Sequence, residues 1–188
     1  MNYIVVNDTL DTVWYAMKAS YGKAKEAKGE LDEMMIESFI TIHYKKEKVN
    51  GRNQMVPKVA IPNLIFVRTD RNHLEAAKSK IDYLHNMLTK SDDRNDVLMP
   101  IIVPDDDMQR FMTVIADAQE KVKFVDVDLN RQIISAGTRV RVIDGKYEGY
   151  EGILCRPKGS RSRKVLIDIC GLAPVEMPII DIELLEEI

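Results

Sequence analysis

Residues 137–154, with the sequence GTRVRVIDGKYEGYEGIL, constrain the fold more than any other stretch of the chain. Two valines alternate with two arginines over residues 139–142, which is the period of a half-buried strand, and a second apolar run begins at Ile153. Three glycines stand where a tight barrel needs a positive φ angle or a close backbone approach: Gly145, Gly149 and Gly152. The stretch therefore predicts two strands of a small β-barrel.

The first half of the chain alternates between strand and helix patterns. Residues 13–19 and 36–44 predict strands, because β-branched and aromatic residues are frequent there. Residues 23–35 between them predict an amphipathic helix whose apolar stripe is Ala24, Ala27, Leu31, Met34 and Met35. The polar stretch 45–54 predicts a loop, in which Asn50-Gly51 is a strong hairpin signal.

The same alternation continues to about residue 120. Residues 63–69, 83–89 and 97–103 predict strands, and residues 71–80 predict a short helix. Pro104 predicts the start of another helix, with three aspartates near its positive end and an apolar stripe of Met108, Phe111, Met112 and Ile115. The fold class is therefore α+β: an N-terminal α/β sandwich with a mostly antiparallel sheet, followed by a small SH3-like β-barrel.

Two domains follow from this reading, residues 1–120 and residues 136–188. Residues 121–135 contain no glycine or proline and alternate loosely between apolar and polar side chains. This segment is either an interdomain linker or a strand added to one of the two domains.

The composition argues against some classes of binding partner and some cellular compartments for this protein. A net charge of −3 argues against a protein that holds nucleic acid by charge alone, since that mode needs a basic face. The two cysteines, Cys155 and Cys170, are too few for a disulfide scaffold. No apolar run is long enough for a membrane span, and the N-terminus lacks a signal-peptide pattern, so we expect a soluble, cytoplasmic protein.

The sequence predicts no enzyme, no cofactor and no metal site. The three histidines are scattered, and no phosphate-binding glycine loop follows a strand. Three consecutive aspartates at residues 105–107 point in different directions around a helix start, where they interact favourably with the helix dipole. We therefore interpret them as structural.

Three segments, in this order, resemble one protein family. Residues 14–18 (WYAMK), followed by a helix and residues 37–40 (ESFI), are similar to the opening of the N-terminal domain of NusG-like transcription factors. Residues 61–67 (IPNLIFV) are similar to a strand of that domain, and residues 137–154 resemble the KOW motif of its C-terminal barrel. The sequence of residues 62–67 looks more similar to that of specialised paralogues, such as the capsule-operon antiterminators of Bacteroidales, than to that of the housekeeping factor.

The resemblance implies a contact with RNA polymerase. In the family, an apolar depression on the N-terminal domain receives the clamp helices of the β′ subunit. The alternative is that these residues are core, which we expect for Trp14, Phe66 and Met112. The residues that the resemblance places on or beside the depression, or that complete its rim, are Tyr15, Ile61, Pro62, Leu64, Phe66, Met108 and Phe111.

Two basic clusters are candidates for nucleic-acid contact. The first follows the first strand and helix, where specialised paralogues face the non-template DNA strand, and consists of Lys18, Tyr21, Lys23 and Lys25. The second puts five positive charges into nine residues of the barrel, as a site for nascent RNA: Arg156, Lys158, Arg161, Arg163 and Lys164. Ordinary solvated surfaces are the alternative for both clusters.

The barrel also contains a departure from the housekeeping pattern. Ile169, Cys170 and Gly171 align with the segment through which housekeeping NusG contacts a small-subunit ribosomal protein, and the position before the glycine is usually aromatic. Cys170 favours a specialised role. The sequence thus predicts a transcription antitermination or elongation factor acting at a specific set of long operons. The alternatives are a housekeeping factor that couples transcription to translation and a KOW protein associated with ribosomes or RNA.

Overall fold

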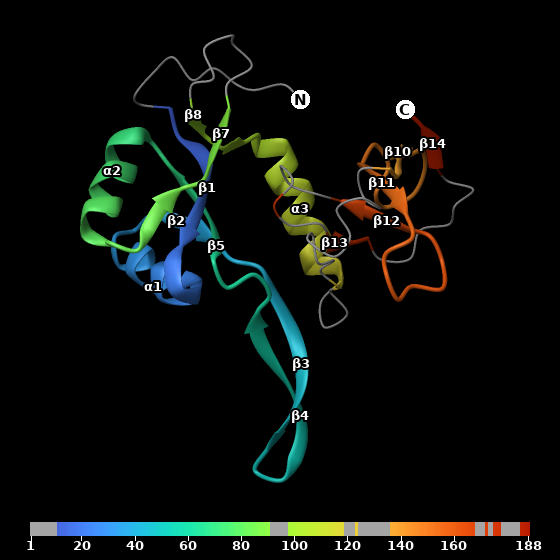
Figure 1. The fold of residues 1–188 in the computed structure, drawn as a ribbon, viewed down its shortest axis with the longest axis horizontal. Coiled ribbons are helices and arrows are strands. Elements are labelled where there is room, and N and C mark those ends of the chain that lie inside the picture. The colour runs from blue at the N-terminus through green and yellow to red at the C-terminus, as the bar shows by residue number, and fades with distance from the viewer. Residues whose placement is uncertain are drawn as a thin grey trace. The chain divides into compact units, whose positions relative to one another are not determined.

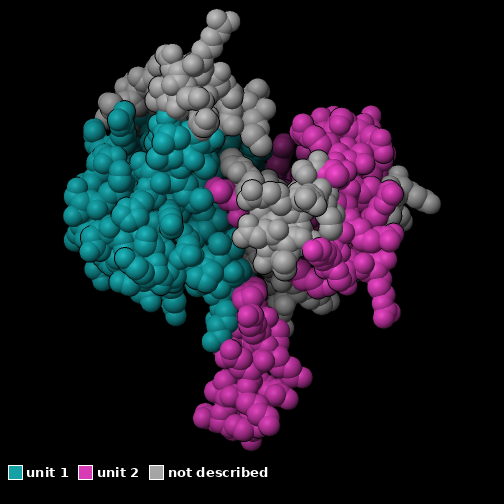
Figure 2. All heavy atoms as spheres, in the orientation of Figure 1, with its two compact units in different colours: residues 1–42, 57–108 teal, residues 43–56, 109–188 magenta. Residues whose placement is uncertain are grey.

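The structure is a computed structural model, and it describes residues 11–90, 98–118, 123, 136–167, 172, 175–177 and 185–188. Contacts divide the chain into two compact units, residues 1–42 with 57–108 and residues 43–56 with 109–188 (Figure 2). In the part of the chain that is described, no helix is both long and apolar enough to cross a bilayer.

An antiparallel sheet of five strands forms the framework of the first unit (Figure 1). Its central strand is β1 (Val13–Ala19), which pairs with β5 (Leu64–Thr69) along one side. On its other side β1 pairs with the short strands β6 (Leu84–Asn86) and β9 (Ile102–Val103), and β2 (Glu37–Phe39) pairs with β5 at the edge. Both β1 and β5 are almost entirely buried, as expected for the centre of a sheet.

Two helices contribute to the main core of this unit. Helix α1 (Ala24–Glu33) buries two alanines and Leu31, and helix α2 (Arg71–Lys80) buries Leu74 and Ala77. They share one apolar cluster with side chains from one face of the sheet, including Tyr15, Met17, Ile65 and Val67. Asp70 caps α2 by accepting hydrogen bonds from the backbone N–H groups of Asn72 and His73, which fixes where the helix begins.

The described elements confirm the predicted α+β class and correct several boundaries. Helix α1 ends at Glu33, and Met35 adopts φ 56° with its side chain 94% exposed, so Met35 leaves the predicted stripe. Residues 36–44 are not one strand, because β2 ends at Phe39 and β3 (Ile42–Val49) begins three residues later. Residues 45–54 are not a loop: most of them belong to β3 and to β4 (Arg52–Val59), which Asn50-Gly51 joins as the hairpin signal predicted.

Later elements follow the predicted order with similar breaks. The segment at 83–89 divides into β6 and β7 (Leu88–Lys90), and the segment at 97–103 divides into β8 (Leu98–Pro100) and β9. Strands β7 and β8 pair only with each other among the described strands. Helix α3 (Asp105–Ala118) begins directly after Pro104, with three aspartates in its first turn.

The second five-stranded sheet lies within residues 136–188. Its antiparallel order is β13-β12-β11-β10-β14, a run of short strands that agrees with the predicted small β-domain. The buried side chains of β10 are Val140 and Val142, whereas Arg139 and Arg141 are exposed, which confirms the predicted alternation. The strands are β10 (Thr138–Val142), β11 (Glu151–Cys155), β12 (Lys164–Ile167), β13 (Val175–Glu176) and β14 (Leu185–Glu187).

Each of the three glycines predicted to shape this domain has an identifiable role. Gly145 and Gly149 adopt φ 89° and 79°, values that favour glycine over residues with a side chain. Gly152 has no positive φ, but a Cβ atom placed there would lie 2.7 Å from the carbonyl oxygen of Leu166 and 2.8 Å from a Val165 methyl. The glycine at 152 therefore permits the close approach of β11 and β12.

Candidate functional site

The predicted polymerase-binding residues lie on two different faces of the first sheet. Tyr15 is opposite Val67 in the ladder and belongs to the core cluster that α1 and α2 share. Phe66 is opposite Ala16, so its side chain lies on the other face, together with that of Leu64 two residues earlier. The structure therefore brings Leu64 and Phe66 together but separates Tyr15 from them.

The second face of the sheet is covered at the start of helix α3. Arg68 lies on this face two residues after Phe66, and its guanidinium contacts Glu37 at 3.4 Å and Asp105, the first residue of α3, at 3.2 Å. These contacts raise the pKa of Arg68, with the hydrogen bond to Asp105 as the main cause. Asp105 thus has an ion-pair partner, which supports a structural role for it.

Five of the seven predicted contact residues are buried in the chain. The exposed fraction is 6% or less for all five, which are Tyr15, Leu64, Phe66, Met108 and Phe111. Trp14 and Phe66 are buried as predicted, whereas Met112 is only half-buried. Ile61 is half-buried and Pro62 is exposed. A partner touching this set would therefore reach Ile61 and Pro62 first.

A hydrogen-bonded corner joins Ile61 and Pro62 to the turn after β1. The backbone N–H of Gly22 donates to Asn63 Oδ1 at 2.7 Å, and the N–H of Ala19 donates to the Asn63 carbonyl at 2.9 Å. The N–H of Ala24 donates to the Pro62 carbonyl at 3.0 Å. We call residues 20–24 with 61–63 the corner. It brings a predicted polymerase contact, Pro62, beside a predicted nucleic-acid contact, Tyr21.

Tyr21 has an unusual conformation within this corner. It lies in the short 3₁₀ turn η1 (Ser20–Gly22) with φ 61°, and its side chain is 89% exposed. A positive φ is unfavourable for an aromatic residue, and such strain is found preferentially at functional sites. Because the ring is so exposed, burial does not explain why tyrosine occupies this position.

The lysines of the first cluster differ in how accessible they are. Lys18, Lys23 and Lys25 are all exposed. The ammonium of Lys23 lies 4.5 Å from the centroid of the Tyr83 ring, a cation–π distance. The Tyr83 hydroxyl donates to Glu30, and burial followed by this carboxylate raises the pKa of Tyr83 to about 12. Lys23 is therefore held in place, and Tyr21, Lys18 and Lys25 are the more accessible members.

Sequence reasoning missed Asn63 as a positioning residue. Its side chain accepts a hydrogen bond from Gly22 in the turn that contains Tyr21, and its carbonyl accepts one from Ala19 at the end of β1. The Pro62-Asn63 pair is a turn signal, but a bond between residues 41 positions apart has no local pattern in the sequence.

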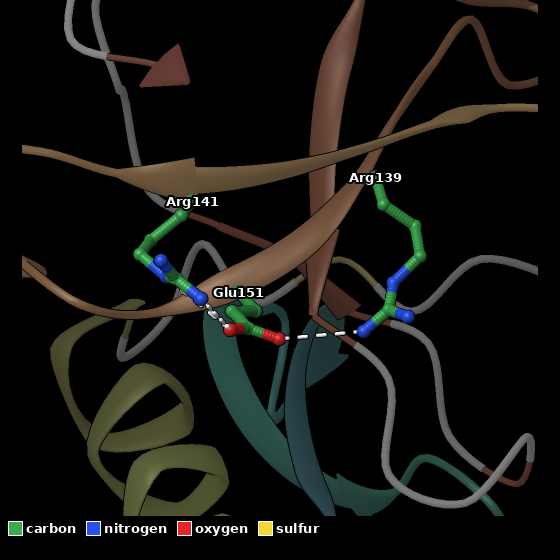
Figure 3. Close-up of polar contacts among 3 residues, drawn as sticks. All are labelled: Arg139, Arg141 and Glu151. Carbon is green, nitrogen blue, oxygen red and sulfur yellow. Dashed lines mark hydrogen bonds and ion pairs between the residues drawn. The ribbon is translucent and has the colours of Figure 1, made fainter. Parts of the chain in front are cut away.

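The two arginines on β10 share one carboxylate. Arg141 contacts Glu151 at 2.7 Å, and Arg139 contacts the other carboxylate oxygen of Glu151 at 3.3 Å (Figure 3). The hydrogen bond from Arg141 is the main reason that the pKa of Glu151 is lowered. These arginines therefore form a local charge network on β10 and β11.

The predicted RNA-binding loop of the barrel is largely exposed. Arg156, Lys158, Arg161 and Arg163 are exposed, and Ser160 stabilises the loop by donating to the Ser162 carbonyl at 2.8 Å. Lys164 differs from the others because it pairs with Glu176 on β13 at 2.8 Å. The predicted partner contacts Ile169, Cys170 and Gly171 lie outside the described residues.

A polar contact links helix α3 to the turn after β10. Asp117 contacts Lys146 at 2.7 Å and accepts a hydrogen bond from the Tyr147 hydroxyl at 3.1 Å. The Lys146 contact is the main cause that lowers the pKa of Asp117, whereas burial and Asp117 raise the pKa of Tyr147 to about 12. Among the described residues, no group of three or more His, Cys, Asp or Glu side chains could hold a metal ion.

Comparisons with known proteins identify the family. Among solved structures, the chain is similar to one described as "Domain interaction in Thermotoga maritima NusG", with 18% identity, a TM-score of 0.46, and coverage of 95% of this chain and 98% of that chain. No curated protein matches the chain. The family model described as "Transcription termination factor nusG" matches residues 12–112, more than half of the 188 residues, and the chain therefore belongs to the NusG family of transcription factors.

Proposed function

We propose that this NusG-family protein binds RNA polymerase through residues 1–120 and suppresses pausing or early termination at a specific set of long operons. Proteins of this family act in transcription elongation and termination and bind RNA polymerase. The observation that supports the proposal most directly is the family match over residues 12–112, which contains the whole corner. The division at residues 120 and 136, with a linker between, is part of the proposal.

The corner is the proposed polymerase contact. Ile61 and Pro62 are the accessible members of the apolar set, and the buried Leu64 and Phe66 follow them on β5. An apolar partner helix would exclude water from Ile61 and Pro62 on binding. A charge introduced there would then be buried without a partner, which is unfavourable.

The proposed mechanism is differential affinity. A factor that binds the elongating conformation of polymerase more tightly than the paused one shifts the population toward elongation by no more than that affinity difference. On this proposal, Tyr21 and the neighbouring lysines contact the non-template DNA strand, and the loop at residues 156–164 contacts nascent RNA or a protein partner.

Capture of purified RNA polymerase by the tagged full-length chain tests the proposal. We expect Ile61→Glu and Pro62→Glu to weaken capture about tenfold or more, which corresponds to about 1.4 kcal/mol. Leu88→Glu is the matched control, because Leu88 is 49% exposed on β7 and lies outside the corner. Leu64→Glu would be a poor probe, since Leu64 is only 4% exposed and a charge there would disturb the fold.

A pause assay on a single template supplies the functional readout. The wild-type protein should shorten the pause. With the Ile61→Glu variant, the pause should be as long as it is when no factor is added. Wild-type capture and activity in both corner variants would place the polymerase contact elsewhere. A wild-type protein that binds polymerase but lengthens pauses would refute the antitermination role while leaving the polymerase contact intact.

A further inference from the structure

The hairpin formed by β3 and β4 has no buried residue along its whole length. Its eight-residue strands pair only with each other among the described strands, and none of residues 42–59 is buried. A strand of eight residues extends about 26 Å at the usual rise. Asn50 and Gly51 form the connecting turn with φ 50° and 76°. Two-stranded ribbons are only marginally stable without a packed face, so exposure of this length requires an explanation.

The hairpin also has the opposite charge to the rest of the chain. Residues 42–59 contain five basic side chains and one acidic side chain, a net charge of +4. The net charge of the chain is −3, which leaves −7 for all other residues. All five basic side chains are exposed: Lys45, Lys46, Lys48, Arg52 and Lys58.

Positive charge occurs on both faces of the ribbon. Strand alternation places Lys46 and Lys48 on one face and Lys45 on the other. The two-residue turn pairs Val49 with Arg52, which puts Arg52 on the same face as Lys45. A surface that packs against another protein usually has one apolar face. A ribbon with cations on both faces instead matches a partner that has negative charge on both sides of it.

We propose that the β3–β4 hairpin binds duplex DNA, with the ribbon in the major groove and its lysines on the flanking phosphates. The major groove of B-form DNA is about 12 Å wide and admits a two-stranded β-ribbon. The major groove of an A-form RNA duplex is too deep and narrow for side chains to reach. Five basic residues confined to one ribbon provide local charge complementarity that the slightly acidic chain as a whole does not. The hairpin shares no residue with the corner, which is the proposed polymerase contact.

Fluorescence anisotropy of the full-length protein with a short blunt-ended DNA duplex tests this proposal without polymerase. The test variant is Lys45→Gln, Lys46→Gln, Lys48→Gln. The control is Arg71→Gln, Lys78→Gln, Lys80→Gln on α2, which changes the net charge equally. We expect the hairpin variant to lose about tenfold or more in affinity at low salt. The slope of log K against log salt should become less steep by about 2 to 3, because each phosphate contact contributes about 0.9. The control should stay close to wild type.

Several results would overturn the assignment. They are no duplex binding by the wild-type protein at low salt, equal losses in the hairpin and α2 variants, or an RNA duplex of the same sequence bound at least as tightly as the DNA. The last result would point to RNA as the partner.

Lysines on exposed strand edges also prevent strand-to-strand aggregation. If that is their whole role, the hairpin variant will aggregate more while binding the duplex like wild type. Polymerase capture by the same variant is measured separately, so the duplex result leaves the proposed function intact.

Discussion

At the scale of single residues, the corner combines strain with exposure. Tyr21 has φ 61°, although asparagine or glycine would tolerate that conformation better. The residue is 89% exposed, so its ring contributes little burial to offset the strain. The Asn63 side chain fixes the turn by accepting a hydrogen bond from the backbone N–H of Gly22, which keeps the Tyr21 ring at one place on the surface. This arrangement is expected where a side chain serves binding rather than stability.

We expect Tyr21→Asn to stabilise the protein and weaken its nucleic-acid contact. Asparagine adopts positive φ more readily, so the free energy of unfolding should rise by up to about 1 kcal/mol. Loss of the ring removes base stacking, worth about 1 to 3 kcal/mol per base. Denaturant unfolding and binding of single-stranded DNA are the two measurements. Tyr21→Phe, which keeps both ring and strain, is the control. A drop in stability for Tyr21→Asn would show that the ring packs against the fold.

Asp117 should make a pH-dependent contribution to stability. The folded state lowers its pKa below the ordinary value of 3.8, so its contribution is present above that value and is lost as pH falls through the folded pKa. We expect Asp117→Asn to lower the free energy of unfolding by about 0.5 to 1 kcal/mol at pH 6, where the Lys146 and Tyr147 contacts are made. The difference from wild type should shrink below pH 3.8. A difference that stays constant from pH 6 to pH 3 would contradict this assignment.

At the scale of elements, the sequence predicted best where side chains are buried. The strand at residues 13–19 and the helix at residues 71–80 match β1 and α2 at both ends, because β1 is a short, nearly continuous apolar run and Asp70 caps the start of α2. Residues 45–54, which contain most of β3 and the start of β4, were predicted as a loop, because neither face of the ribbon is buried and no alternation marks it. Hydrophobic periodicity reports burial, so exposed strands give no such signal.

The candidate site could be predicted only in part for a related reason. The sequence of residues 61–67 indicated which strand belongs to the proposed polymerase contact. It did not reveal that Leu64 and Phe66 are buried while Pro62 is exposed. The sheet face that carries Leu64 and Phe66 is covered through contacts between residues far apart in the sequence, such as Arg68 and Asp105. The hydrogen bond from Gly22 to Asn63 is likewise nonlocal.

Two glycine substitutions should have opposite effects, each set by its element. Gly152→Ala would place a Cβ atom 2.7 Å from the Leu166 carbonyl between β11 and β12, and we expect a loss of about 1 to 3 kcal/mol in the free energy of unfolding. Gly29→Ala in α1 meets no atom within 4 Å and should add about 0.5 to 1 kcal/mol through helix propensity. Thermal unfolding of both variants measures the contrast. Equal stability of Gly152→Ala and wild type would show that β11 and β12 can separate without cost.

At the scale of the whole molecule, each part of the chain contains its own core. The main cluster around Met17, Leu31 and Ile65 draws all of its buried members from residues 15–84. The barrel buries a separate set, which includes Val140, Leu166 and Val175. Separate cores are the physical basis for expecting two domains that fold independently, joined by the segment at 121–135.

Expressing residues 1–120 and residues 136–188 separately tests that division. The first fragment keeps the main cluster and the corner, so we expect it to unfold cooperatively and to capture RNA polymerase about as well as the full chain. The second fragment has only 53 residues, and a domain of about 60 residues buries only about 60% of the surface that its unfolded chain exposes, a smaller share than a larger domain buries. It also loses the hydrogen bond that the Tyr147 hydroxyl donates to Asp117 and should therefore unfold at a lower temperature than the same residues in the full chain. Polymerase capture by residues 136–188 but not by residues 1–120 would reverse the assignment of the two domains.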